Sequence, residues 1–475
     1  PDRAGLFNVF PICILFLKLY FSEKECRFEH ANGGRSFLQK SGGHCPAGGF
    51  AEFDFLQRQS DGYHHAGQFG RSGAFCSSLA NQVFFIYTVA VFGIASGAIV
   101  LCSQYWGKQD VGAICRVTAL ALRLAAAAGL FTMVFLLAFP RQIMQVFTNE
   151  PDVIQAGVDY LRIVCFSYLF YGVTSTFLMV LRSTETVNIA VVIYAVSFVV
   201  NVGGNYAFIF GKFGAPRMGV AGAAVGTVLA RVAEFLLVLG YMAFFEKKLR
   251  FRPRMVALAS GGLGRDLFRY GMPVMMNELL WSLAISMHSV VLGHMGSDVV
   301  AANSICYIMY QMVTSIIFGV ANGSAVLVGK IIGAGDWAYA RACVSRLVRV
   351  YAVLGVVCAI LVFAIGLPML ALYDIQPTTV ALAQKLMGVY AFAMFFQAFT
   401  CPLISGVLRG GGDTRFAMAV DVGCIWAMVP LGAAAFWLGA PAVIVLFVLK
   451  FDMPIKAALC LRRLAGGQWI RSVTR

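Results

Sequence analysis

The chain has 475 residues, of which 60% are apolar and 12% are charged, and its mean hydropathy is +0.78. These values exclude an ordinary soluble domain and predict a membrane protein with room for about a dozen spans of roughly 20 residues each. The formal charge of +15 does not indicate a nucleic-acid partner, because the basic residues gather in alternate loops between the apolar runs.

The first 77 residues differ in character from the rest. Residues 7–21 are apolar but short, whereas residues 22–76 carry many charged residues and glycines. Gln68–Cys76, back-translated with selected codons and read one nucleotide later, becomes Ser-Leu-Gly-Glu-Val-Ala-Leu-Ser-Ala, which resembles Met295–Asn303. We therefore interpret residues 1–77 as an out-of-frame reading of a first helix, in which case this chain is a frameshifted, non-functional product. A real polar extension is the alternative.

After residue 77, apolar runs of spanning length alternate with breaks rich in Gly, Pro and Asn. We expect eleven helices, at 79–105, 116–139, 157–181, 188–211, 219–245, 267–293, 299–330, 344–372, 380–408, 415–437 and 440–461. With the disrupted first helix they form an all-α polytopic membrane protein of two six-helix bundles. The predicted parts are an N-lobe (78–245), a basic linker (246–266), a C-lobe (267–463) and a tail (464–475).

An internal repeat supports this division. The stretch Gly93–Asp110 returns as Gly319–Asp336 with seven of its eighteen positions identical. In each copy, small residues end a long apolar run, and a Gly and an Asp then mark the exit of the helix from the membrane. Because each repeat holds an even number of helices, the two bundles enter the membrane in the same sense, and a site is expected between them near the midplane.

Loop charge predicts the orientation. One set of alternate connections holds most of the basic residues, whereas the other set holds little beyond Arg141, Lys212 and Arg217. By the positive-inside rule, the basic loops and the tail are cytoplasmic and the protein lies in the plasma (inner) membrane. Members of the basic set include Lys108, Arg116, Arg182, Lys247, Lys248, Arg250, Arg265, Arg269, Lys330, Arg341, Arg409, Arg415, Arg462, Arg463 and Arg471.

Taken together, these motifs resemble the multidrug and toxic compound extrusion (MATE) family. The resemblance rests on both copies of the repeat, on VLRGGGDTRF at Val407–Phe416, and on Ala80-Asn81-Gln82; it covers roughly residues 77–463. It implies a V-shaped exporter that exchanges organic cations for H⁺ or Na⁺, with no other cofactor and no enzymatic activity. The repeated loop motifs are Gly107, Asp110, Gly333 and Asp336, joined by Arg409 and Asp413.

Carboxylates inside the helices are the main candidates for cation binding, because a charge at the bilayer centre costs roughly 2.5–3.5 kcal/mol and persists only for a reason. Glu278 lies inside the seventh helix and resembles the cation-site acid of sodium-coupled relatives; a protonated, structural Glu is the alternative. Asp421 is a second candidate, or a snorkelling carboxylate. Gln82 and Gln397 are further candidate ligands.

The N-lobe offers fewer candidates. Arg231 and Glu234 share a helix face and are predicted to form a structural ion pair. Asn201 and Asn205 are one turn apart, and they either line a cavity or join helices. Aromatic residues such as Tyr87, Tyr168 and Tyr171 suit a cavity for flat cations, or simply form a core. No metal-ligand spacing occurs, and the 13 cysteines are read as small buried hydrophobes.

The sequence also departs from the family pattern. The first-helix Asp of proton-coupled members falls in the unreadable segment, and the tenth-helix Asp of sodium-coupled members is replaced by Ala398. The coupling ion, H⁺ or Na⁺, is therefore open.

A lipid-linked oligosaccharide flippase of the same superfamily is the alternative function. It needs cationic residues for pyrophosphate, whereas the interior here is expected to be acidic or neutral apart from Arg231. An intramembrane aspartyl protease is rejected, because Asp336 and Asp374 lie at opposite ends of one predicted helix. We expect a monomer in the lipid bilayer, with small organic cations as substrates and no nucleic-acid partner.

Overall fold

The computed structural model describes residues 71–258, 261–370 and 376–474, and every regular element in these ranges is helical. Within them, ten helices are long and apolar enough to cross a membrane. Nearly all of the segment interpreted as out of frame, residues 1–70, lies outside the described residues. The chain is thus a multi-pass membrane protein, as its composition predicts.

The elements fall into two groups in chain order. The first group holds α3 (Arg71–Gly107), α4 (Val111–Ala138), α5 (Pro140–Phe147), α6 (Pro151–Ser183), α7 (Asn188–Phe210), α8 (Val220–Gly240) and the π-helix η3 (Tyr241–Phe245). A short 3-10 helix, η4 (Pro253–Ala257), lies in the linker. The second group holds α9 (Leu263–Gly293), α10 (Ser297–Gly333), α11 (Trp337–Leu370), α12 (Pro377–Cys401), the π-helix η5 (Pro402–Leu408), α13 (Thr414–Trp437), α14 (Ala442–Lys450) and α15 (Asp452–Ala465).

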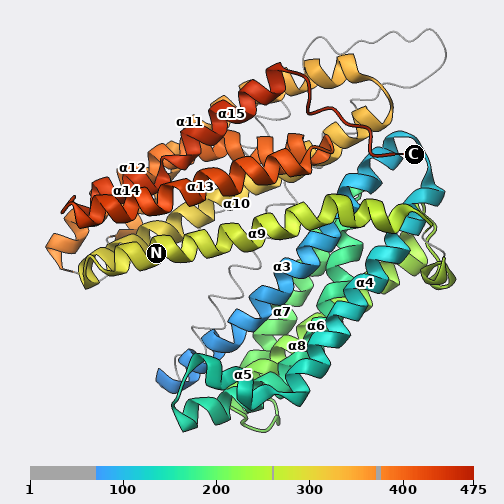
Figure 1. Ribbon diagram of the computed structural model, residues 1–475. Helices are drawn as coiled ribbons and strands as arrows, with labels where there is room; N and C mark the ends of the chain where they lie inside the picture. Colours follow the sequence, from blue (N-terminus) through green and yellow to red (C-terminus); the bar gives the residue numbers. More distant parts are fainter. Residues whose placement is uncertain (1–70, 259–260, 371–375, 475) are drawn as a thin grey trace.

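The two groups of helices are arranged as a V. Figure 1 shows them converging near the C-terminus and diverging from there, with α9 packed along the second group. Contact between the groups runs mainly through α3, which packs against both α9 and α10. The basic loops lie at the converging end, so we call this end the basic end.

The last predicted helix, 440–461, is not continuous. It is divided into α14 and α15, which are separated at Phe451. Pro454 is the physical reason, because a proline ring clashes with the carbonyl four residues earlier, here that of Lys450, and has no N–H to donate. The break lies beside three charged residues, Lys450, Asp452 and Lys456, in an otherwise apolar segment.

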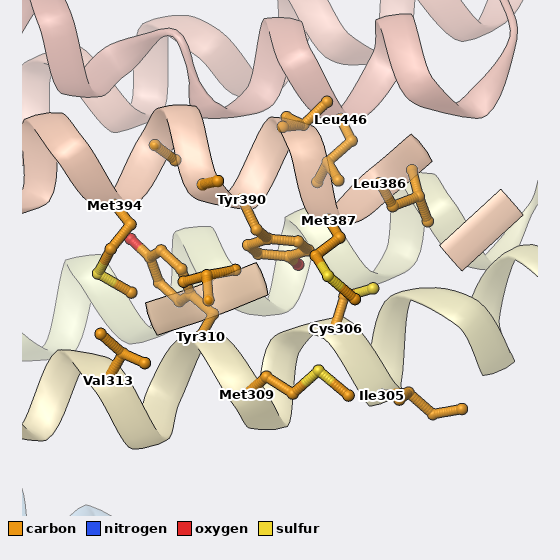
Figure 2. Packing of buried hydrophobic residues seen from close by; sticks show 14 of the residues in the cluster. Ile305, Cys306, Met309, Tyr310, Val313, Leu386, Met387, Tyr390, Met394 and Leu446 are labelled. Carbon is orange, nitrogen blue, oxygen red and sulfur yellow. The ribbon is translucent and has the colours of Figure 1, made fainter. Parts of the chain in front are cut away.

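The core of the second group lies between α10, α12 and α14. Figure 2 shows Tyr310 and Tyr390 pointing toward each other from α10 and α12, with Leu446 of α14 close by. The Tyr310 and Tyr390 rings are 5.1 Å apart, and the Tyr390 hydroxyl donates to Asn303 at 2.8 Å. Many large apolar side chains on the helices, such as Phe131, remain exposed, as expected for helices in contact with lipid.

Both copies of the repeat meet at the basic end. Gly107 of α3 lies against the carbonyl of Lys330 in α10, and Gly333 of α10 lies against the carbonyl of Gln104 in α3. A Cβ atom on either glycine would overlap that carbonyl, so glycine alone permits this approach of the two backbones. The duplicated small residues therefore form the crossing that closes the basic end.

Further contacts reinforce the closure. A Cβ on Gly97 of α3 would come within 2.8 Å of the Cα of Gly271 in α9, so these helices also touch through their backbones. Lys330 of α10 forms an ion pair of 2.5 Å with Glu185, in the loop between α6 and α7. This pair joins the two groups of helices directly.

The tail is part of the same closure. Trp469 is buried, and the N–H of Val473 donates to Oε1 of Gln104 at 2.8 Å. The Gln104 amide in turn donates to the carbonyl of Arg471 at 3.1 Å and to that of Gly410 at 3.2 Å. One α3 side chain thus holds both the tail and the chain segment that follows η5.

Candidate functional site

Glu278 lies near the middle of α9, and its carboxylate meets a cation from the same group of helices. Arg409 donates to Oε1 of Glu278 at 2.9 Å, and the Arg409 side chain is only 6% exposed against 27% for Glu278. The chain widens into the π-helix η5 at Pro402, and this helix ends directly before Arg409. Arg409, predicted as a loop residue, is therefore a buried partner of the accessible carboxylate.

Asp421 of α13 is also paired. Its carboxylate accepts a bond from Asn277 at 3.0 Å and forms an ion pair of 2.7 Å with Lys456 of α15. Lys456 forms a second ion pair of 2.7 Å with Asp452, one turn earlier on its own helix. Because Asn277 and Glu278 are adjacent, α9 contributes a side chain to both the Glu278–Arg409 pair and the Asp421–Lys456 pair.

Lys450, at the end of α14, extends this network toward the core. Its ammonium lies 5.1 Å from the ring centre of Tyr310 and 5.5 Å from that of Tyr390, which is cation–π geometry. The rings are the pair visible in Figure 2. The C-lobe interior thus contains buried Arg409, Lys450 and Lys456, so the expectation that only Arg231 would be cationic inside is wrong. Each of these cations has a partner in the interior: Arg409 pairs with Glu278, Lys456 pairs with Asp421 and Asp452, and Lys450 lies over two tyrosine rings.

Two further polar residues singled out in the sequence, Gln397 and His288, are buried in the second group. Gln397 is buried in α12. His288 of α9 is buried, and its Nε2 forms no hydrogen bond within the described part of the chain.

In the first group, Arg231 and Glu234 form a buried pair on α8. The guanidinium contacts both carboxylate oxygens, at 3.0 and 2.9 Å, and Ser197 of α7 donates to the same carboxylate at 2.7 Å. Arg231 also lies over the Tyr171 ring at 4.8 Å. The two charges are bonded to each other within α8 and contact Ser197 of α7 and Tyr171 of α6, which is the geometry expected of a structural pair.

The other polar N-lobe candidates have different partners from those of Arg231 and Glu234. Asn205 donates to Asn201 at 3.2 Å and packs against Gly226 of α8, so these side chains lie at a helix–helix contact. Gln82 is exposed near the first turns of α3. The Tyr87 hydroxyl donates to the carbonyl of Tyr168 at 2.6 Å, and both rings are buried as core.

The loop motifs have structural partners. Asp110 accepts a bond from the N–H of Ala113 at 2.9 Å and caps α4, and Asp336 accepts one from Tyr339 at 3.0 Å at the start of α11. Each copy of the repeat thus ends in an Asp that caps the helix following it. Asp413 is buried and pairs with Arg463 at 2.8 Å and with Arg471 at 3.2 Å.

The sequence analysis missed Lys450, Asp452 and Lys456. A signal was present, because three charged residues within seven positions of an apolar segment are costly unless they pair. The hydrogen bond from Asn277 to Asp421 could not be predicted either, since it joins residues far apart in the chain.

Comparison with known proteins gives a consistent result. The family model MatE matches residues 76–207 and 273–433. The chain is 24% identical to a probable multidrug resistance protein NorM from Thermotoga maritima over 82% of its own length and 84% of the relative. It is 23% identical to an uncharacterized transporter, YisQ, from Bacillus subtilis over 85% and 89% of the two chains.

Solved structures share the fold. An outward-facing multidrug resistance MATE family transporter superposes with a TM-score of 0.78 at 14% identity, covering 89% of this chain and 94% of that one. A transporter from Pyrococcus furiosus, whose binding pocket is described as having reverse polarity, gives a TM-score of 0.77 at 14% identity, covering 89% and 95%. Because the family model covers more than half of the chain, the protein belongs to the MatE family, the multidrug and toxic compound extrusion transporters, and is not an enzyme.

Proposed function

We propose that this protein is a monomeric antiporter of the plasma (inner) membrane that exports small organic cations in exchange for H⁺ or Na⁺. The observation that carries the proposal is Glu278, a partly accessible carboxylate in the middle of a spanning helix whose partner, Arg409, is itself a cation. Such a carboxylate can exchange one positive partner for another, which is what coupling of two cations requires. The names of the relatives support multidrug compounds as substrates.

The exchange follows from charge balance. A cationic substrate competes with the Arg409 guanidinium for the Glu278 carboxylate, and it is released when a coupling cation takes its place. In the state described here the basic end is closed by the crossing of α3 and α10. Separation of that crossing would give access from the opposite side and complete alternating access.

The number of ligands that each ion requires favours H⁺ as the coupling ion. Glu278 and Asp421 already have cationic partners, Arg409 and Lys456, which either coupling ion has to displace. A sodium ion must then find several oxygen ligands, whereas a proton needs only one carboxylate oxygen.

The test is efflux of a fluorescent organic cation from cells that express the chain with an intact first helix, followed by proteoliposomes with a pH or a sodium gradient. We expect Glu278→Gln to abolish efflux, because the neutral amide neither balances the charge of a cation nor takes up a proton. The pH gradient should drive transport of the unmodified protein and the sodium gradient should not.

The matched control is Asp159→Asn, which makes the same chemical change at an exposed position of α6 and should leave efflux intact. Unchanged efflux by Glu278→Gln would remove that residue from the mechanism. Transport driven by sodium alone would assign Na⁺ as the coupling ion.

The flippase remains a second candidate, and buried Arg409, Lys450 and Lys456 favour it because cations suit a pyrophosphate group. It predicts no efflux of organic cations under either gradient, together with translocation of a lipid-linked pyrophosphate between the two leaflets of the same proteoliposomes.

A further inference from the structure

A cavity of about 230 Å³ opens at the basic end, where the first turns of α9 and α13 meet the tail. Three arginines and three hydroxyl-bearing side chains account for most of its lining. They are Arg269, Arg415, Arg471, Tyr270, Thr414 and Ser472.

The cavity carries an excess of positive charge. Neither Arg269 nor Arg415 forms an ion pair with another residue in the described ranges, and both are exposed. Arg471 is the exception, because one of its nitrogens lies 3.2 Å from Asp413. No carboxylate lines the cavity itself. The planar guanidinium presents several N–H groups that match the oxygens of a phosphate, and hydroxyl groups supply further donors.

The surroundings of the cavity indicate which kind of phosphate compound would bind there. Phe268 and Met272 flank Arg269 on α9, lie one turn apart, and are 59% and 42% exposed. An exposed apolar face beside a basic cavity at the end of a spanning helix suits one molecule with acyl chains and an anionic head group. We propose that this cavity binds the phosphate of an anionic phospholipid, whose chains lie along Phe268 and Met272.

Such a lipid would act on the closure of the basic end. The tail supplies Arg471 and Ser472 to the cavity, and its neighbour Val473 bonds to Gln104 of α3. Gly412 also lines the cavity with φ +84°, and a Cβ there would come within 2.9 Å of the Arg471 carbonyl, so the tail is packed tightly against this wall. A bound head group therefore holds the tail where it joins the two groups of helices.

The experiment is a thermal-unfolding titration of the purified full chain in mixed micelles with phosphatidylglycerol, with phosphatidylcholine, or with inorganic phosphate alone. Phosphatidylglycerol should raise the Tm of the unmodified protein, and the other two should not. Arg269→Gln or Arg415→Gln should raise the midpoint of the titration roughly tenfold, the loss expected for one charge-assisted contact.

Arg265→Gln is the matched control, because Arg265 lies one turn from Arg269, is exposed and does not line the cavity. Its midpoint should equal that of the unmodified protein. Arg269→Lys replaces Arg269→Gln if the latter fails to fold, and should show a smaller loss. Equal midpoints in all variants would show that phosphatidylglycerol acts through general surface charge, and would overturn the proposed site. A full Tm rise with inorganic phosphate alone would overturn the lipid and assign the cavity to a soluble anion.

Discussion

At the residue scale, the C-lobe shows that charges inside a membrane protein come in sets. The acids Glu278 and Asp421 stand out in the sequence, but their partners do not, because Arg409 and Lys456 reach them from other helices. Each pair offsets part of the cost of removing its charges from water. Lys456 forms two such pairs, since it bridges Asp421 and Asp452, and it is almost fully buried.

Because Lys456 has two partners, its replacement should destabilise the protein more than replacement of Asp421. Lys456→Met should leave the buried Asp452 and the half-buried Asp421 carboxylates without their cation and lower the free energy of unfolding by about 3–5 kcal/mol. Asp421→Asn should cost clearly less, because Lys456 keeps Asp452 as its partner. Thermal unfolding of both purified variants in the same detergent measures the difference. A larger loss for Asp421→Asn would mean that Asp421, not Lys456, organises the network.

At the element scale, prolines and glycines decide where helices break and where they cross. Pro454 divides the last predicted helix into α14 and α15, and Gly107 and Gly333 let α3 and α10 touch through their backbones. Hydrophobic periodicity predicts where a helix lies, whereas this break and this crossing each depend on one or two residues. A feature that depends on a single residue is easier to overlook in a sequence.

The crossing can be tested with one methyl group. Gly333→Ala should force α3 and α10 apart, because its Cβ would overlap the Gln104 carbonyl, and should cost about 1–3 kcal/mol. Hydrogen exchange should then accelerate at the amide of Val473, which is bonded to the Gln104 side chain. Gly423→Ala is the control, because nothing lies within 4 Å of its Cβ. Unchanged exchange in Gly333→Ala would show that the tail does not depend on this crossing.

At the scale of the whole molecule, the closed end of the V is also the end that carries most of the positive charge. The crossing of α3 and α10, the Lys330–Glu185 ion pair and the tail all lie at the end that carries the basic loops. An exporter in this state is closed toward the cytoplasm if the basic loops face it, as the positive-inside rule predicts.

Orientation is tested with single cysteines in a cysteine-free background. Phe213 and Lys247 are exposed in loops at opposite ends of the helix formed by α8 and η3. A membrane-impermeant maleimide added to intact cells should label Phe213→Cys and not Lys247→Cys, and both should react after permeabilisation. The reverse pattern would invert the topology and make the closed end the outer one.

The sequence by itself determined the class of protein, the position of most helices, the repeat and the basic loops, because hydropathy, periodicity and charge are local properties of the chain. It also identified Glu278 and Asp421, since a carboxylate in an apolar run is costly wherever it lies. Only the tertiary structure decided their partners. Arg409 reaches Glu278 across 131 residues of sequence, Asn277 reaches Asp421 across 144, and the tail reaches Gln104 across 369. Contacts of that kind depend on how helices pack, and no window along the chain contains both partners.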